Sequence, residues 1–219
     1  PQQISFAAIL FVLTVGLASA RAYRGPHELK RAVLSALVHE RLPCVGFALP
    51  DAPAPQSVSP PQDQRLSPGD HPRSITVDGR QRSYLLHLPP AAASGKLLPL
   101  VIMLHGGGGI AENAAKDTAW SAKADSIGFI AAYPNATATD ASKPSRLLRN
   151  PQTWNDGSGR FKKEGGIPND VAFIGAVIDD IATRTALDRK RVFVTGFSNG
   201  ASMTFAVAAG LSDRIADRK

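Results

Sequence analysis

Ser198 lies in the segment whose residue types and spacing are best suited to covalent catalysis. Residues 196–201 read GFSNGA, with the apolar run 191–195 before them and the small residues 201–209 after them. A strand, a sharp turn with serine at its tip and a helix form a nucleophile elbow, and glycine on both sides suits so crowded a turn. The pattern predicts Ser198 as a nucleophile, with the amide of Asn199 facing the oxygen that becomes negative. An ordinary small-residue turn is the alternative.

A glycine-rich loop is the second feature that suits this chemistry. Residues 105–109, HGGGG, follow the apolar run 97–104. Glycine lets the main chain approach a substrate and point an amide at it, as in the loop that completes an oxyanion hole. We expect Gly107 to be this second donor, and His105 to order the loop rather than act as a base. A plain flexible loop is the alternative, while a P-loop is excluded because no Gly-Lys-Ser or Gly-Lys-Thr follows.

No histidine follows Ser198, although in folds with this elbow the acid and the histidine come after the serine. The chain has five histidines, and all of them precede it: His27, His39, His71, His87 and His105. We therefore expect a chain truncated at its C-terminus, without the acid and histidine of a triad and with little activity of its own. For the same reason we expect the strand over residues 191–195 to lie at a sheet edge.

Two residues outside these loops are further candidates. Trp154 lies in the polar stretch 135–168, where we expect it to bind substrate as an aromatic wall of the acyl pocket; packing in the core or the loop is an equal alternative. Asp170 follows Asn169 at the start of an apolar helical pattern. Helix capping is the first interpretation of this pair, and support of the site by Asp170 is the second.

Composition argues against several other classes of function. The 219 residues carry a net charge of +7, but the basic residues are scattered and form no stripe interleaved with aromatic residues. We therefore expect no nucleic-acid partner. Cys44 is the only cysteine, so no disulfide can form within the chain, and no cysteines and histidines show metal-ligand spacing. We expect neither a metal nor a cofactor.

The first 72 residues differ in composition from the rest. Residues 6–17 are apolar at all but two positions and are followed by Ala18-Ser19-Ala20, which is typical of a secretory signal peptide. The run is too short to span a membrane. We expect a signal peptide over residues 1–22, no stable membrane anchor, and secretion into the periplasm or the medium; a buried helix is the alternative. The prolines of residues 50–72 predict a leader and linker over residues 23–72.

Residues 73–219 alternate between predicted strands and helices. Strands are expected at residues 74–80, 82–88, 97–104, 128–134 and 191–195, and helices at residues 112–127, after Asn169 and after Ser198. A near-continuous apolar strand such as 97–104 indicates a parallel strand covered on both faces. The alternation predicts an α/β domain, a mainly parallel sheet with helices on both faces.

Taken in order, these segments resemble a known group of enzymes. The resemblance runs from about residue 66 to residue 211 and rests on residues 67–71 (SPGDH), 82–89 (RSYLLHLP), 100–107 (LVIMLHGG), 153–155 (TWN), 169–173 (NDVAF) and 191–201 (RVFVTGFSNGA). They are similar to segments of secreted α/β-hydrolase esterases of the polyhydroxybutyrate depolymerase type, which are related to feruloyl and acetylxylan esterases.

The resemblance implies an α/β-hydrolase fold, incomplete at its C-terminus, and a serine carboxylic-ester hydrolase that works through an acyl-enzyme. The nucleophile of the family maps onto Ser198, and an ester, polymeric or small, is the implied partner. Residues 73–219 would be the N-terminal part of the catalytic domain. A feruloyl or acetylxylan esterase, a serine peptidase of the same fold and a noncatalytic binding module are the alternatives.

Overall fold

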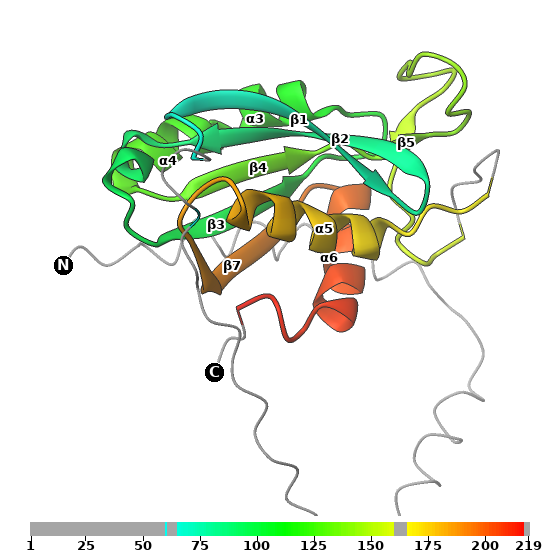
Figure 1. Cartoon of the computed structure of the whole chain (residues 1–219). Helices are drawn as coiled ribbons and strands as arrows, with labels where there is room; N and C mark the ends of the chain where they lie inside the picture. The colour runs from blue at the N-terminus through cyan, green and yellow to red at the C-terminus, as the bar shows by residue number, and fades with distance from the viewer. Residues whose placement is uncertain (1–59, 61–64, 160–165, 217–219) are drawn as a thin grey trace, which may run out of the picture. The chain divides into compact units, whose positions relative to one another are not determined.

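A five-stranded sheet with the strand order β1-β2-β4-β3-β7 lies at the centre of the described part of the chain in the computed structural model (Figure 1). The structure describes residue 60 and residues 65–159 and 166–216. The predicted signal peptide, 1–22, and most of the predicted leader and linker, 23–72, lie outside the described residues. The strands are β1 (Gly69–Val77), β2 (Arg80–Leu88), β3 (Leu98–Leu104), β4 (Ile130–Pro134) and β7 (Leu187–Gly196).

The sheet is parallel on one side and antiparallel on the other. β3 pairs in parallel with β4 and β7, whereas β2 runs antiparallel to β1 and β4. β1 and β2 form a hairpin because Asp78 and Gly79 both have positive φ, 50° and 72°, which is the backbone of a type I′ turn. The predicted strand, turn and partner strand over residues 74–88 are confirmed.

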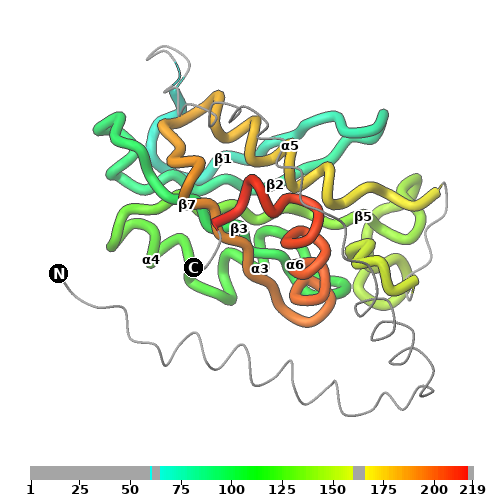
Figure 2. Tube along the Cα trace, turned by 90° about the horizontal axis from the view of Figure 1, so that it is seen from below, coloured from blue at the N-terminus to red at the C-terminus, as the bar shows by residue number. Residues whose placement is uncertain are grey.

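Helices cover both faces of the sheet, as predicted. They are α3 (Ala111–Thr118), α4 (Trp120–Ile127), α5 (Asp170–Ala182) and α6 (Asn199–Gly210); a short 3₁₀ helix, η3 (Pro90–Ser94), and a ribbon of β5 (Thr137–Ala138) and β6 (Gln152–Thr153) are the other described elements. α5 and α6 belong to one apolar cluster, and α3 and α4 belong to a second one. Figure 2 shows α5 on one side of the strands and α3 and α4 on the other. No helix in the described ranges is long and apolar enough to cross a membrane.

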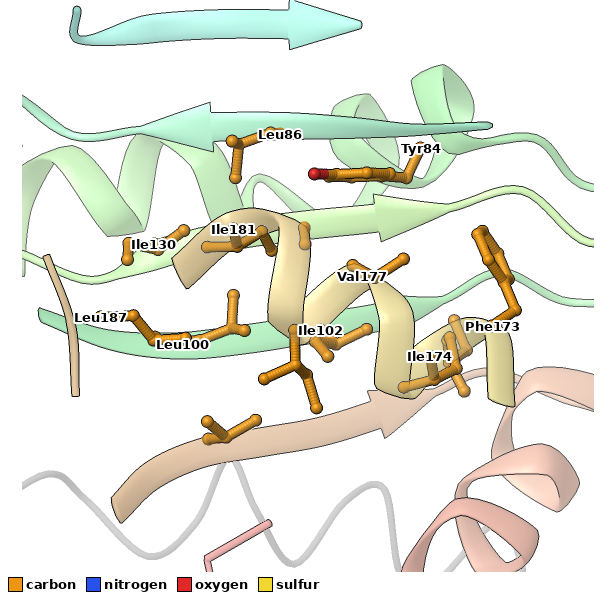
Figure 3. Close-up of a cluster of buried hydrophobic side chains, with 14 of the residues drawn as sticks. Tyr84, Leu86, Leu100, Ile102, Ile130, Phe173, Ile174, Val177, Ile181 and Leu187 are labelled. Carbon is orange, nitrogen blue, oxygen red and sulfur yellow. The ribbon is translucent and has the colours of Figure 1, made fainter. Parts of the chain in front are cut away.

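β3 is buried on both faces because its side chains alternate between the two clusters. Leu100 and Ile102 belong to the cluster with α5, whereas Met103 belongs to the cluster with α3 and α4. Figure 3 shows Ile174 and Val177 of α5 packed over the β3 residues of the first cluster. Burying each of these side chains contributes roughly 1.5–3 kcal/mol. The apolar run over residues 97–104 is what this two-sided burial requires.

One prediction about the helices is wrong. Residues 112–127 were expected to form a single helix, but α3 and α4 are separate and meet at Ala119, whose φ is 53°. This left-handed residue redirects the chain, and both helices then bury alanines in the same cluster, Ala111 and Ala114 from α3 and Ala124 from α4. Alanine has the highest helix propensity of all residues, so the composition contains no sign of the break.

β7 is the edge strand of the sheet among the described residues. It pairs with β3 from Leu98 opposite Leu187 to Leu104 opposite Gly196, and no described strand lies on its other side. The predicted edge position is therefore confirmed, although the strand begins at Leu187 rather than at residue 191. Phe193 on this strand has 46% of its surface exposed. An exposed apolar edge is a template for pairing with another chain.

Candidate active site

Ser198 occupies the turn between the end of β7 and the start of α6. The residue is exposed, and its φ of 52° and ψ of −117° lie far from the regions that serine ordinarily adopts. Such a backbone costs about 1–3 kcal/mol and persists where surrounding contacts enforce it, most often at functional sites. The turn is held by Phe197 N, which donates to Leu104 O at 3.1 Å, and by Gly200 N, which donates to Phe197 O at 2.8 Å.

Gly196 and Gly200 leave no room for a side chain on either side of Ser198. A Cβ atom on Gly200 would lie 2.5 Å from the carbonyl oxygen of His105 and closer still to that of Leu104. A Cβ atom on Gly196 would lie 2.5 Å from the carbonyl oxygen of Gly200. The prediction that this turn needs glycine because its neighbours crowd it is confirmed.

The glycine loop, residues 105–109, follows β3 and lies directly beside this turn. A Cβ atom placed on Gly106 would lie 3.5 Å from Cβ of Ser198, and one placed on Gly107 would lie 3.8 Å from Cβ of Asn199. The reason is the parallel pairing of β3 and β7, which puts Leu104 opposite Gly196. The structure therefore brings together Ser198, Gly107 and Asn199 from two distant segments of the sequence.

The main-chain amides of Gly107 and Asn199 are the donors that this arrangement offers. α6 begins at Asn199, and the first amides of a helix have no acceptor within it. Among the described residues, the Gly107 amide donates to no main-chain carbonyl, whereas Gly108 N donates to Gln152 O at 2.6 Å and Gly109 N to Gly106 O at 2.9 Å. The Asn199 amide at the N-terminus of α6 and the Gly107 amide in the glycine loop beside it favour a negative oxygen between them. Their role as oxyanion donors stays a prediction.

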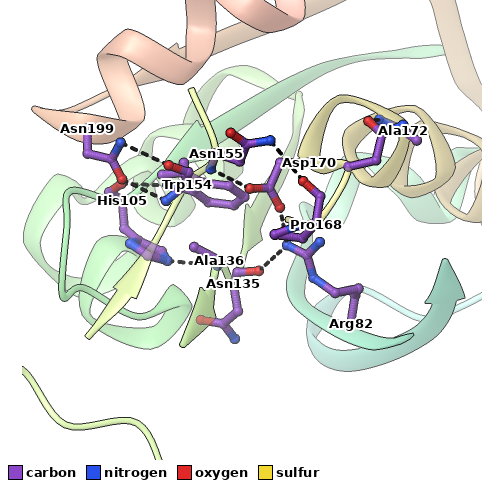
Figure 4. A network of polar contacts seen from close by, with 11 residues as sticks. Arg82, His105, Asn135, Ala136, Trp154, Asn155, Pro168, Asp170, Ala172 and Asn199 are labelled. Carbon is purple, nitrogen blue, oxygen red and sulfur yellow. Dashed lines mark hydrogen bonds and ion pairs between the residues drawn. The ribbon is translucent and has the colours of Figure 1, made fainter. Parts of the chain in front are cut away.

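Trp154 joins the glycine loop to the start of α6. Its side chain is fully buried, its Nε1 donates to His105 O at 2.8 Å, and its ring centre lies 5.2 Å from that of the His105 imidazole. Trp154 N donates to Asn199 Oδ1 at 2.7 Å, and Asn199 Nδ2 donates back to Trp154 O at 3.2 Å (Figure 4). This placement fits the packing interpretation of Trp154, and contact with a substrate stays a prediction.

A buried ion pair supports the same segment from the side of α5. Asp170 accepts hydrogen bonds from Arg82 Nη2 and Asn155 N, both at 2.6 Å, and the Asp170 and Arg82 side chains are 0% and 5% exposed. The Arg82 guanidinium also lies 3.9 Å from the centre of the Phe173 ring. Burial lowers the pKa of Arg82, against the opposing effect of the Asp170 carboxylate. Asp170 therefore holds the residue next to Trp154 in place.

Sequence patterns predict only part of this ion pair. Asn169 is the helix cap, since its Oδ1 accepts from Ala172 N at 3.0 Å. Asp170 instead supports the segment next to Trp154, through its hydrogen bond with Asn155 N. Arg82 is not among the site residues that the sequence predicts. Its position in the sequence does indicate that it is buried. Arg82 lies two residues before Tyr84 on β2, and side chains two apart on a strand lie on the same face, which here is buried. A buried arginine needs a carboxylate partner.

Among the described histidines, His105 is the one that lies near Ser198, directly after the end of β3. Both nitrogens of its ring form hydrogen bonds. Nδ1 donates to Gly106 O at 2.7 Å, and Nε2 accepts from Ala136 N at 3.1 Å. Burial lowers the pKa of His105, so the neutral ring is favoured. These contacts confirm the interpretation of His105 as a residue that orders the loop.

The other two described histidines lie on β1 and β2, on the side of the sheet away from β7. His87 is opposite Ala131, at the beginning of β4, and His71 is opposite Leu86 on the neighbouring strand. Ser198, by contrast, follows the end of β7. In the part of the chain that the structure describes, no group of three or more histidine, cysteine, aspartate or glutamate side chains is arranged to hold a metal ion.

Two exposed apolar side chains border the glycine loop and were not among the predicted site residues. Leu147 lies against Gly108, and Phe197 lies against Gly106, with Cδ1 3.0 Å from where a Cβ atom would stand. Their exposed fractions are 66% and 67%. Phe197 could have been selected from its place inside the GFSNGA segment. Leu147 lies in a polar stretch without periodicity, so the sequence gives no signal for it.

Comparison with known proteins relates the chain to esterases. A family model described as Esterase PHB depolymerase matches residues 82–216. The chain is 31% identical over 189 residues to "Putative esterase NocK" of Nocardia uniformis subsp. tsuyamanensis, covering 79% of this chain and 50% of the relative. It is 28% identical over 145 residues to acetylxylan esterase A of Emericella nidulans, covering 64% of this chain and 40% of the relative. The chain thus spans half the length of the first relative and less of the second.

Solved structures share the fold at low sequence identity. A ferulic acid esterase matches with a TM-score of 0.52 and 16% identity, covering 69% of this chain and 57% of that chain. The native form of the protein pOPH matches with a TM-score of 0.52 and 19% identity, covering 71% of this chain and 50% of that chain. Likenesses at this level of identity show the fold alone, and they confirm the predicted α/β-hydrolase architecture.

Proposed function

This chain belongs to the Esterase PHB depolymerase family, and on that premise we propose that Ser198 is the nucleophile of a serine carboxylic-ester hydrolase. The main support for the proposal is the placement of Ser198. This exposed serine with a strained backbone lies between β7 and α6, and Gly107 and Asn199 lie beside it. A nucleophile elbow and an oxyanion hole require this combination.

In the proposed reaction, Ser198 Oγ attacks the carbonyl carbon of the ester and gives its proton to a base. The carbonyl oxygen becomes an oxyanion and accepts hydrogen bonds from the amides of Gly107 and Asn199. As the tetrahedral intermediate collapses, the bond to the alcohol oxygen breaks, the alcohol leaves with a proton, and the acyl group stays on Oγ. Water then hydrolyses this acyl-enzyme and regenerates the serine hydroxyl.

From the order of serine, acid and histidine in folds with this elbow, we propose that the base is none of the histidines that precede Ser198, so this chain alone should turn esters over slowly. Of the described histidines, His105 has both ring nitrogens engaged, and His71 and His87 lie on β1 and β2, with β4 and β3 between them and β7. An unassisted serine hydroxyl is a weak nucleophile at neutral pH. Oxyanion stabilisation and binding alone leave an acceleration of roughly 10³–10⁴-fold over water.

Leu147 and Phe197 are the proposed contacts for an apolar acyl group. Both border the glycine loop, and both expose apolar surface that an acyl chain would cover. Removing such surface from water contributes about 25 cal/mol per Å². The names of the family and of its relatives, which mention PHB, acetylxylan and ferulic acid, support carboxylic esters as the substrate class, polymeric or small.

We further propose that the protein is exported. Support comes from the sequence alone, from the apolar residues 6–17 and the small residues Ala18-Ser19-Ala20. Fractionation of cells that express the chain with and without residues 1–22 tests this proposal. Export that does not depend on these residues, or retention of both forms in the cytoplasm, would contradict it.

Ester turnover by matched chains tests the proposed function. Hydrolysis of p-nitrophenyl acetate and butyrate would be measured for the 219-residue chain, for a longer form that continues past Lys219, and for Ser198→Ala in each. We expect slow turnover by the first, rapid turnover by the second, and loss of both on substitution, with Ser202→Ala as the matched control. Rapid turnover by the 219-residue chain would contradict the proposal about the base. Turnover unaffected by Ser198→Ala would contradict the nucleophile.

A further inference from the structure

The segment of residues 152–156 lies between the glycine loop and α6 and is hydrogen-bonded to both. We infer that Trp154 and the side chain of Asn199 set the spacing between the two proposed oxyanion donors, the main-chain amides of Gly107 and Asn199. This inference rests on the proposed function. It makes Trp154 and the Asn199 side chain positioning residues, which act on the reaction through the placement of the donors.

Three contacts fix the glycine loop to this segment. Gly108 N donates to Gln152 O at 2.6 Å, and Trp154 Nε1 donates to His105 O at 2.8 Å. Between these bonds, a Cβ atom on Gly107 would lie 3.7 Å from Cγ2 of Thr153, so the main chain of Gly107 lies next to that methyl group. Because the contacts flank Gly107, the position of its amide follows the position of Trp154.

The Asn199 side chain fixes the same segment to α6. Its Oδ1 accepts from Trp154 N at 2.7 Å, and its Nδ2 donates to Trp154 O at 3.2 Å and to Asp156 Oδ2 at 3.1 Å. The side-chain amide thus pairs with both main-chain groups of Trp154, as a neighbouring strand would. With Asn199 only 4% exposed, water does not readily replace these bonds.

A third anchor holds the segment against α5. Asn155 N donates to Asp170 Oδ2 at 2.6 Å, and Asn155 Nδ2 donates to Pro168 O at 3.0 Å. Asp170 is in turn held by Arg82 of β2 (Figure 4). The segment is therefore tied to the glycine loop, to α6 and to α5. Oxyanion donors stabilise charge because they are fixed in advance, and a displacement of about 1 Å costs roughly 10²-fold in rate.

Phosphonylation of Ser198 by a p-nitrophenyl alkylphosphonate tests the inference on the 219-residue chain. Ser198 Oγ forms a bond to phosphorus, p-nitrophenolate leaves, and the hydroxyl proton passes to imidazole added as an external base. The phosphoryl oxygen takes the place of the oxyanion, so the rate depends on both donors. The second-order rate constant is followed by p-nitrophenolate release and by intact mass, and each variant is also melted.

Trp154→Phe is the mildest variant, because it keeps an aromatic ring and removes the indole N–H that donates to His105 O. We expect labelling about tenfold slower than in the wild type, in a chain that still melts cooperatively. Trp120→Phe is the matched control. Trp120 is the only other tryptophan, and it packs edge-on against Phe129 in the cluster across the sheet. It should label at the wild-type rate.

A pair of substitutions provides a rescue that a merely structural role would not predict. Asn199→Asp keeps the main-chain amide and the acceptor for Trp154 N, but it places a second carboxylate against Asp156. We expect labelling slower by roughly 10²-fold. With Asp156→Asn added, the amide at position 156 can donate to the carboxylate at position 199. The double variant should therefore recover part of the labelling rate.

The outcomes separate the inference from the function on which it rests. Failure of the wild-type chain to label at Ser198 would overturn the proposed function. Labelling of the wild type together with wild-type rates for Trp154→Phe and Asn199→Asp would overturn the inference alone. The inference would also be overturned if the labelling rates of the variants fell in proportion to their melting temperatures and if adding Asp156→Asn to Asn199→Asp restored no rate.

Discussion

Ala136 N donates a hydrogen bond to His105 Nε2 at 3.1 Å, and this bond decides what His105 can do. Because Nε2 is an acceptor here and Nδ1 donates to Gly106 O at 2.7 Å, the neutral ring has no nitrogen left to take a proton from Ser198. The histidine beside the glycine loop is therefore part of the loop's structure. A base for the proposed nucleophile must come from elsewhere.

The buried ring of His105 should make stability depend on pH. Burial lowers its pKa below the ordinary value of 6.5, so below that pH the unfolded chain binds a proton that the folded chain does not. The contribution of His105 is therefore present above about pH 6.5 and is lost as the pH falls toward the lowered pKa. Urea unfolding from about pH 8 to about pH 5 should show a smaller fall for His105→Gln than for the wild type. Parallel curves would contradict this prediction.

Gly200→Ala should destabilise the fold strongly. The new methyl group would run into the carbonyl oxygens of Leu104 and His105, which belong to the main chain and cannot move aside. We expect a loss of about 3 kcal/mol or more in the free energy of unfolding. Gly107→Ala is the control, since its Cβ would meet only atoms at 3.7 and 3.8 Å. Similar denaturation midpoints for the two variants would show that the turn is not crowded.

Asp170→Ala should also be costly, because it leaves the Arg82 guanidinium buried without its counter-charge. Breaking a buried pair of this kind costs about 3–5 kcal/mol. Asp188→Ala removes a surface pair with Arg191, whose side chain is 52% exposed, and should cost about 0–1 kcal/mol. Chemical denaturation of both variants measures the difference. A small loss for Asp170→Ala would mean that Arg82 finds water or another partner.

The 219-residue chain should associate through β7. This strand lies at the edge among the described residues, and Phe193 on it is half exposed. Size-exclusion chromatography with light scattering should detect dimers or larger species whose population grows with concentration. Phe193→Lys, which places a charge on the edge, should reduce them. A wild-type chain that stays monomeric at high concentration would rule out this use of the edge.

The sequence predicts well those features that depend on neighbouring residues. The apolar run of β3, the Asn169 cap and the Asp78-Gly79 turn each follow from a few adjacent residues. Ser198 and the glycines around it belong to the same class, because a tight turn between a strand and a helix restricts which residues fit. The break at Ala119 is the exception, since an alanine-rich stretch favours one continuous helix and only packing against the sheet divides it.

Contacts between distant residues are the part that the sequence does not predict. Arg82 and Asp170 are 88 positions apart, and Trp154 and Asn199 are 45 positions apart. Local patterns can mark single residues of these pairs as candidates. Which residue contacts which, however, depends on how β2, α5 and α6 come together in the fold. For this reason Trp154 could be selected as important while its buried placement between the glycine loop and α6 could not be foreseen.

Peptide mapping after reaction with a p-nitrophenyl alkylphosphonate tests most directly whether Ser198 is the nucleophile. Ser198 lies in the tryptic peptide of residues 192–214, which also contains Ser202 and Ser212. Fragmentation of this peptide should place a single adduct on Ser198. The adduct should be absent in Ser198→Ala and unchanged in Ser202→Ala. An adduct that persists in Ser198→Ala, or one that maps to another residue of the wild-type chain, would contradict the account.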